Sequence, residues 1–325
     1  MSDLLIRRRN LLIRKQEEEM NIRAVCFKAD GEQTVAITKV GSAPAITMQY
    51  SYDGVTWDAW DLTPLPFGGS AKVYVRGVGN YTFGKDKNSY NKITFGTDAY
   101  VYVSGIAEAL IDGENEVQTY TYAYILSWLF LGQTALRSVE NLRFEAQSSI
   151  AENVYSYMFH GCSNLLYAPK SLSIESFSGG YECAYMFSKC TSLIKAPKLP
   201  ATTLSTRCYQ RMFGDCRSLV SAPELNATTL ANYCYEYMFS TCTSIVDAPE
   251  LPATNLAAGC YQAMFGNCKS LKTIRCHAKV TASKAVINWV TGIATSGTFY
   301  GYSEYGWSSG SSGIPSGWEF VELTD

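Results

Sequence analysis

Apolar residues recur through the middle of the chain at an almost constant spacing. A Met-Phe pair begins at residues 158, 186, 212, 238 and 264, and each Met is followed by a Cys after four residues and by a Leu or Ile after seven. Such self-similarity is typical of stacked repeats, because one short unit cannot bury its apolar face alone. The segment CYxxMFxxC predicts a short helical turn, and SLxxAPxL predicts an extended segment. The Met, Phe, Leu and Cys columns are therefore expected inside a solenoid.

Residues 21 to about 105 show a different period. Apolar and polar residues alternate in AVCFKA, TVAITKV, AITMQYSY, KVYVRGVG and AYVYVSG, which predicts half-buried strands. Asp53-Gly54 separates two apolar runs and is a strong hairpin signal. Trp57 and Trp60 follow, and either a place in the core or a surface that stacks on a sugar is open to them.

Together these patterns predict a mixed β and α/β solenoid fold in four parts. Residues 1–20 form an N-terminal anchor or docking segment, 21–105 an antiparallel β-sandwich-like domain, 106–276 the repeat solenoid and 277–325 a C-terminal cap. A cap is expected because the last repeat would otherwise expose its apolar face. The aromatic residues of the cap are open between packing and a binding platform. They are Tyr300, Tyr302, Tyr305 and Trp307.

The first twenty residues carry two apolar pairs seven residues apart, Leu4 with Leu11 and Ile6 with Ile13. Two heptad steps are too short for a stable coiled coil, so the segment is expected either to fray or to fold against a larger assembly. The basic run at 7–9 splits the apolar triplets, so a general export signal is not expected. The chain is expected to stay in the cytoplasm where it is made.

Charge and metal-ligand residues exclude several classes of function. The 27 basic and 29 acidic residues are nearly balanced, which argues against a nucleic-acid partner. Only His160 and His277 occur, and there is no Cys-x-x-Cys pair, so neither a zinc site nor any other cofactor is expected. The eleven cysteines are expected to be buried thiols, with disulfides between some neighbouring repeats left open.

The repeat consensus over residues 150–276, CYxxMFxxCxSLxxAPxLPATTL, resembles the BspA-like (Treponema-type) leucine-rich repeat of surface proteins in gut Bacteroidales and of the phages that infect them. SYDGVTWDAW, VSGIAEAL, INWVTGIATSGTFY and SGIPSGWEFVE resemble the segments that flank such repeats. The resemblance implies adhesion or recognition and carries no catalytic motif. The chain departs from bacterial surface members of the family at its front, where they usually begin with an export signal.

These observations favour a noncatalytic phage virion structural protein, a tail or capsid appendage that recognises the host. The N-terminal segment would bind a virion protein, the solenoid would bind a host surface glycan or protein, and a homo-oligomer is compatible with the heptad pairs. The alternative is a bacterial cell-surface adhesin with the same body. A glycan hydrolase would need paired carboxylates in a concave site, whereas the acids here repeat with the period.

Ligand contacts are expected in the extended segments, where the repeats differ most. The positions nine and twelve residues after each Met change from basic to acidic along the stack, which would orient a partner. A solvated edge without a partner has the same pattern. The candidates are Tyr167, Lys195, Ser221 and Asp247 in the first column, and Lys170, Lys198, Glu224 and Glu250 in the second.

Overall fold

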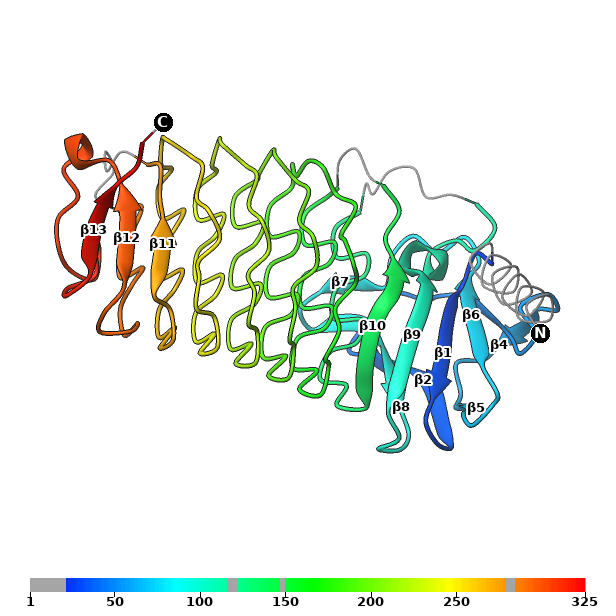
Figure 1. Ribbon diagram of the computed structural model, residues 1–325. Coiled ribbons are helices and arrows are strands. Elements are labelled where there is room, and N and C mark those ends of the chain that lie inside the picture. The colour runs from blue at the N-terminus through cyan, green and yellow to red at the C-terminus, as the bar shows by residue number, and fades with distance from the viewer. Residues whose placement is uncertain (1–21, 116–121, 147–149, 279–283, 325) are drawn as a thin grey trace, which may run out of the picture.

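The computed structural model describes residues 22–115, 122–146, 150–278 and 284–324. Figure 1 shows a stack of chain coils, with a two-layered β region at one end and three strands near the C-terminus at the other. One continuous cluster of buried apolar residues runs from Val25 to Trp318. The core of the β region therefore passes without a break into the core of the stack.

One layer of the β region is a six-stranded sheet. Its strands are, in order, β10 (Leu136–Arg143), β9 (Val101–Ile106), β1 (Val25–Ala29), β6 (Val73–Gly77), β3 (Met48–Ser51) and β4 (Asp58–Trp60). Neighbours are antiparallel except β9 and β10, which are parallel. The hairpin expected at Asp53-Gly54 is confirmed, because this turn joins the antiparallel pair β3 and β4, with Gly54 at a φ of 79°.

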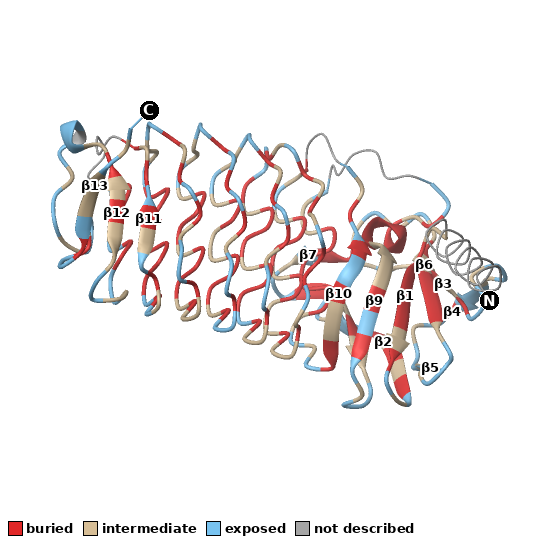
Figure 2. Ribbon diagram, in the orientation of Figure 1, coloured by how far each residue is buried: buried red, intermediate tan, exposed pale blue. Residues whose placement is uncertain are grey.

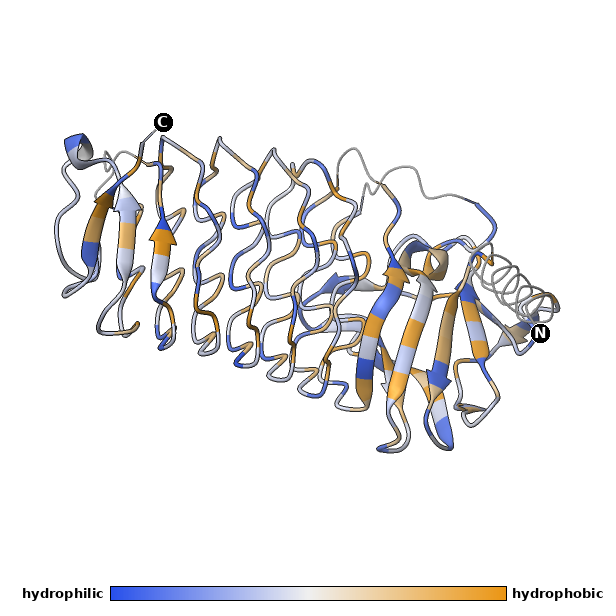
Figure 3. Cartoon of the chain, in the orientation of Figure 1, coloured by the Kyte–Doolittle hydropathy of each residue, from blue (hydrophilic) through white to orange (hydrophobic). Residues whose placement is uncertain are grey.

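The other layer is a four-stranded antiparallel sheet. Its order is β5 (Leu65–Phe67), β2 (Gln33–Val40), β8 (Ser89–Phe95) and β7 (Gly84–Asp86). The layers meet where the ring of Phe27 contacts Phe67 and Phe95 at centroid distances of 6.2 and 5.9 Å. Most large apolar side chains of the two layers are buried (Figures 2 and 3), and this four-stranded sheet also buries the polar residues Gln33, Ser89 and Asn91. Each large apolar side chain buried here stabilises the fold by roughly 1.5–3 kcal/mol.

The two tryptophans near the hairpin have different positions. Trp60 is buried and donates its ring N–H to the carbonyl of Thr63 at 2.8 Å. Trp57 is half-exposed, and the guanidinium of Arg76 lies 4.2 Å from the centre of its ring. Trp60 is therefore a core residue, and one face of Trp57 is covered by a cation.

Along the stack, one face is formed by extended segments that pair in parallel. Isolated bridges join Ser138 of β10 to Tyr167, Tyr167 to Lys195 and Lys195 to Ser221. At the far end, Asp247 is bridged to Thr273, which begins a parallel three-stranded sheet. Its strands are β11 (Thr273–Arg275), β12 (Thr298–Gly301) and β13 (Glu319–Glu322). The edge of the six-stranded sheet thus continues, unit by unit, toward the C-terminal sheet (Figure 1).

The CYxxMFxxC segments form successive turns whose backbone N–H groups alternate between two kinds of acceptor. In the unit around Met212, the N–H groups of Tyr209, Arg211 and Phe213 donate to carbonyls of the next unit at 2.8 to 3.0 Å. Those of Met212 and Gly214 donate to the carbonyl three residues back. The same alternation extends through the units between residues 124 and 267. Half of these donors are therefore satisfied only when the next unit is in place.

The predicted α/β solenoid is wrong. The described residues contain no α-helix, and their helical elements are the two 3₁₀ turns η1 (Ala107–Leu110) and η2 (Ser303–Tyr305). The strands form three small open sheets, so the described chain is almost entirely strand and turn. Apolar spacings of four residues imitate a helical face. However, φ is positive at every fourth residue of the turn segments, and a right-handed helix does not allow this.

Thr241 offers a direct test of this left-handed backbone. It has a φ of 66° and occupies the column in which another unit has Gly161 at 74°. A side chain in this region costs about 1–2 kcal/mol, and a glycine costs about 0.5–1 kcal/mol through the entropy of the unfolded chain. We therefore expect Thr241→Gly to raise the free energy of unfolding by about 0.5–1 kcal/mol in urea titrations. Thr241→Ala keeps the strain and should gain nothing. A Gly variant less stable than the Ala variant would contradict the left-handed turn.

Two ladders fill the inside of the stack. The rings of Phe130, Phe159, Phe187, Phe213, Phe239 and Phe265 stack in this order at 5.2 to 5.8 Å, with planes within 9° of parallel. The cysteine four residues after each Met donates its thiol to the carbonyl of the Phe in the preceding unit, as Cys216 does to Phe187 at 3.1 Å. The same bond recurs at 3.0 to 3.1 Å for Cys162, Cys190, Cys242 and Cys268. A cysteine therefore supplies both volume and a donor at this position.

The ten cysteines from Cys162 to Cys276 are fully buried thiols, so the buried-thiol prediction is confirmed for the repeats. Burial raises the pKa of the Cys162 and Cys268 thiols to about 12. Because the thiolate is the reactive form, we expect iodoacetamide at pH 8 to leave all ten unmodified in the folded protein. Mass spectrometry of urea-unfolded protein should show complete labelling in the same time. Labelling of any of the ten in the folded state would contradict the closed core.

Candidate binding face

All eight residues predicted as ligand contacts are exposed. Tyr167, Lys195 and Ser221 are consecutive members of the bridged column that begins at Ser138. The extended segment explains the exposure, because in SLIKAPKL the residues Leu193, Pro197 and Leu199 are buried. We call the exposed surface of β10, the extended segments and β11 the strand face. The structure thus brings the predicted contacts onto one surface.

Residues of the second predicted column, twelve positions after each Met, have polar contacts at both ends of the strand face. Lys170 donates to the side-chain oxygen of Asn141 in β10 at 3.4 Å. Lys198 is bridged to Ser171 of the preceding unit. At the far end, a carboxylate oxygen of Glu250 lies 2.8 Å from Nε2 of His277. Lys170 and Lys198 therefore lie toward the β10 end, and Glu224, Asp247 and Glu250 lie toward the β11 end, where the exposed cations Lys272 and Arg275 also lie.

The sequence patterns did not predict a groove that lies at the β10 end of the strand face, which we call the basic end. It has a volume of about 680 Å³. Its lining residues are Lys28, Ser104, Gly105, Glu140, Asn141, Leu142, Arg143, Phe144, Lys170, Ser171 and Ser173. Of the predicted contacts, Lys170 lines the groove. Lys28 joins it because β9 lies between β1 and β10, a neighbourhood that no local sequence pattern announces.

A row of aliphatic side chains accompanies the polar column. Ile194, Val220 and Val246 lie eight residues after their Met and are 38, 53 and 45% exposed. They adjoin Lys195, Ser221 and Asp247 in the sequence, so the strand face offers apolar contact area beside its polar groups. The sequence shows an Ile or Val at this position in three units. The pattern alone did not show whether these side chains are buried or exposed.

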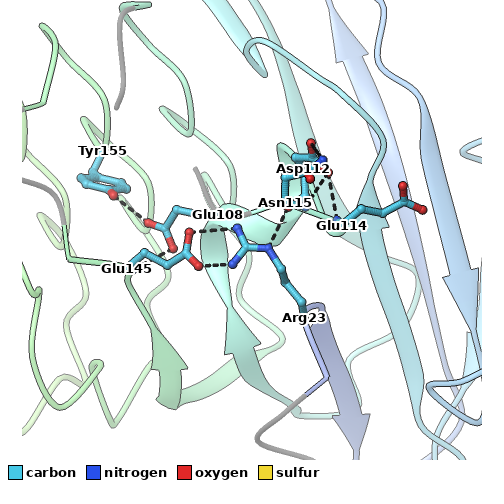
Figure 4. Close-up of polar contacts among 7 residues, drawn as sticks. All are labelled: Arg23, Glu108, Asp112, Glu114, Asn115, Glu145 and Tyr155. Carbon is cyan, nitrogen blue, oxygen red and sulfur yellow. Dashed lines mark hydrogen bonds and ion pairs between the residues drawn. The ribbon is translucent and has the colours of Figure 1, made fainter. Parts of the chain in front are cut away.

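A buried carboxyl group joins the β region to the first repeat units (Figure 4). Glu108 is fully buried and accepts hydrogen bonds from the Tyr155 hydroxyl at 2.8 Å and from the Glu145 N–H at 3.0 Å. Both carboxylate oxygens of Glu145 in turn contact the guanidinium of Arg23. Arg23 also donates to the carbonyl of Asp112 at 3.1 Å. The network ties together η1, the segment after β10, the residue Arg23 before β1 and a turn segment.

Burial raises the pKa of Glu108 to about 7, and the nearby carboxylate of Glu145 adds a smaller contribution in the same direction. The hydrogen bonds from Tyr155 and Glu145 act in the opposite direction. A raised carboxyl pKa occurs at some proton-transfer sites. Because Glu108 is fully buried, we expect its ionisation to change the stability of the junction between the β region and the first repeat units.

The remaining candidates lie at the two ends of the chain. Leu4, Ile6, Leu11 and Ile13, predicted as anchoring residues, lie outside the described residues. Among the cap aromatics, Tyr300 has the guanidinium of Arg275 3.9 Å from its ring centre, and Tyr302 approaches Nδ1 of His277 at 3.4 Å. Trp307 stacks on the buried Trp289 at 5.5 Å and so belongs to the packing. The side chain of Tyr305 lies outside the described part.

Within the described ranges, no group of three or more His, Cys, Asp or Glu side chains is placed to hold a metal ion. The same part of the chain has no helix with the length and apolarity needed to cross a membrane. No protein-family model, no curated protein and no solved structure matches the chain.

Proposed function

We propose that the chain is a noncatalytic recognition protein that binds a ligand on a bacterial host surface through the strand face. The observation that supports this function is the arrangement of exposed, variable residues in bridged columns that end in a groove. Stacked repeats commonly present extended surfaces of this kind to a ligand. The ring and thiol ladders beneath the face hold it in one conformation, so little ordering would oppose binding.

The resemblance of the repeat to BspA-like leucine-rich repeats supports a setting for this function. In the proposed setting the protein is an appendage of a phage virion, attached to another virion protein through residues 1–20 and able to self-associate there. The alternative is a bacterial cell-surface adhesin that uses the same strand face. Pull-down of virion components by the full chain and by a chain without residues 1–20 separates the two settings. The phage proposal requires that only the full chain retains a virion protein.

A charge-reversal pair tests the strand face. Lys195→Glu with Lys198→Glu should weaken binding to a panel of Bacteroidales cells at least tenfold, because it introduces repulsion where the ligand lies. A tenfold loss corresponds to about 1.4 kcal/mol, the sum expected from two exposed charges. Lys189→Glu, an exposed reversal in a turn segment, is the matched control and should bind as the original protein does.

Binding is measured with fluorescently labelled proteins on whole cells, and thermal unfolding confirms that each variant is folded. Equal binding by all three proteins would contradict the strand face as the binding surface. So would a loss confined to Lys189→Glu. Absence of binding to every cell type would count against the recognition function itself.

A further inference from the structure

We propose that the groove at the basic end of the strand face binds an acidic polysaccharide, a sugar polymer with carboxylate or phosphate groups along its chain. The proposal rests on the recognition function above and names the ligand class for it. It is carried by the charge, the hydrogen-bonding groups and the dimensions of the groove.

The charge of the groove is opposite to that of the whole chain. Lys28, Arg143 and Lys170 line it against one carboxylate, Glu140, whereas the chain has a formal net charge of −2. The three cations come from β1, β10 and a repeat unit, so folding brings them together from distant parts of the sequence. A concave surface lined by one sign of charge attracts a ligand of the other sign. The groove is therefore suited to an anion.

The cationic surface continues beyond the groove along the strand face. Ser171, which lines the groove, is bridged to Lys198 of the next unit, and Lys195 of that unit is also exposed. Paired extended segments lie about 4.8 Å apart. Cations therefore recur at short intervals in the direction of the stack, as a polymer with repeated anionic groups requires. The acidic positions Glu224, Asp247 and Glu250 would repel such a polymer and separate the groove from the cations near β11, Lys272 and Arg275, so the polymer should occupy the β10 end.

The other lining groups suit sugar hydroxyls. Ser104, Ser171 and Ser173 supply hydroxyl groups, and Asn141 supplies an amide, each able to donate and accept hydrogen bonds. A volume of about 680 Å³ lies within the range of roughly 300–1,000 Å³ that is typical of ligand sites. The groove can therefore hold a few sugar residues, with the rest of a polymer passing over the strand face.

The lining favours a polysaccharide over two other anionic partners. Single-stranded nucleic acids are held largely by bases stacked on aromatic side chains. The one aromatic residue that lines the groove, Phe144, is only 4% exposed. An acidic protein would need a complementary surface of about 800 Å² on each partner, centred on an apolar patch. The groove instead concentrates charge and small polar groups in a concavity.

The test uses the full chain and soluble probes. An alginate hexasaccharide has a carboxylate on every residue, a β-mannan hexasaccharide is its neutral counterpart, and a phosphomannan fragment supplies phosphate in place of carboxylate. A six-nucleotide oligothymidylate is the nucleic-acid probe. Affinities are measured by calorimetry at several salt concentrations. Arg143→Ala with Lys170→Ala removes two groove cations, and Lys189→Ala, an exposed change in a turn segment away from the strand face, is the matched control.

We expect alginate, phosphomannan or both to bind, with the tighter of the two identifying the anionic group. The double variant should bind at least tenfold more weakly, while Lys189→Ala should not change affinity. The slope of log affinity against log salt concentration should fall by about one for each groove cation removed. Thermal unfolding checks that both variants remain folded.

Equal binding of the neutral mannan, tighter binding of the oligothymidylate, or no binding of either anionic glycan at low salt would overturn the proposal. Cell binding separates this failure from failure of the proposed function. If the original protein and the double variant bind host cells equally, the groove proposal fails and recognition through another part of the strand face stands. If the original protein binds no cells, the proposed function itself fails.

Discussion

Phe213→Ala is expected to lower the free energy of unfolding by about 3–5 kcal/mol, a large part of the stability of an ordinary domain. Phe213 is fully buried and stacks between Phe187 and Phe239 at 5.7 Å on each side. Its carbonyl also accepts the thiol of Cys242. Removal of the ring leaves a cavity between Phe187 and Phe239, because hydrogen bonds between successive units, such as that from the Phe213 N–H to the Met238 carbonyl, hold the units at their spacing.

Urea denaturation followed by circular dichroism measures this loss. Val220→Ala is the matched control, because Val220 lies in the extended segment of the same unit and is 53% exposed. Its effect should stay within about 0.5 kcal/mol. A loss below about 1 kcal/mol for Phe213→Ala would contradict an internal ring ladder. The transition can also broaden, because repeats contact mainly their neighbours and a weak unit divides the stack.

Glu108→Gln is expected to stabilise the protein by about 3 kcal/mol at pH 8 and by little at pH 4.5. The pKa of Glu108 is raised from 4.5 to about 7 in the folded state by burial. As pH rises, the unfolded chain therefore loses the Glu108 proton first, and stability falls between pH 4.5 and 7 and is constant above that range. Each pKa unit corresponds to about 1.4 kcal/mol. Glutamine cannot ionise, so the variant avoids this loss.

Urea titrations at pH 4.5, 6 and 8 measure the effect, with Glu175→Gln as the control for the change in net charge at an exposed position. Tyr155→Phe supplies a second test. The Tyr155 hydroxyl lowers the pKa of Glu108, so its removal should extend the fall in stability to higher pH. Parallel pH profiles for the original protein and Glu108→Gln would contradict a buried carboxyl group at the junction.

The sequence was sufficient to predict which residues form the interior of the stack. The Met, Phe, Leu and Cys columns repeat in register, and a column that stays apolar in every unit has to face the other units. Even the weaker copy at Leu129-Phe130 takes its place, with Phe130 stacked on Phe159. Alternation also located strands of the β region, and the exposed columns of the extended segments followed from the same register.

The conformation of the turn segments could not be predicted in this way. A spacing of four residues between Cys208, Met212 and Cys216 fits a helix over so short a stretch. The turns are instead held by N–H groups that donate to the next unit, and this partner is about 25 residues away. The groove was missed for a related reason, because Lys28 and Lys170 meet only through the order of strands in a sheet.

Lysine footprinting on host cells tests most directly whether the strand face is the binding surface. The protein is acetylated with a soluble reagent, free and bound to cells, and the rate at each lysine is measured by mass spectrometry. We predict severalfold protection of Lys170, Lys195 and Lys198 in the bound protein, with Lys189 in a turn segment unchanged. Unchanged rates at the three strand-face lysines, or protection centred on Lys189, would contradict the account.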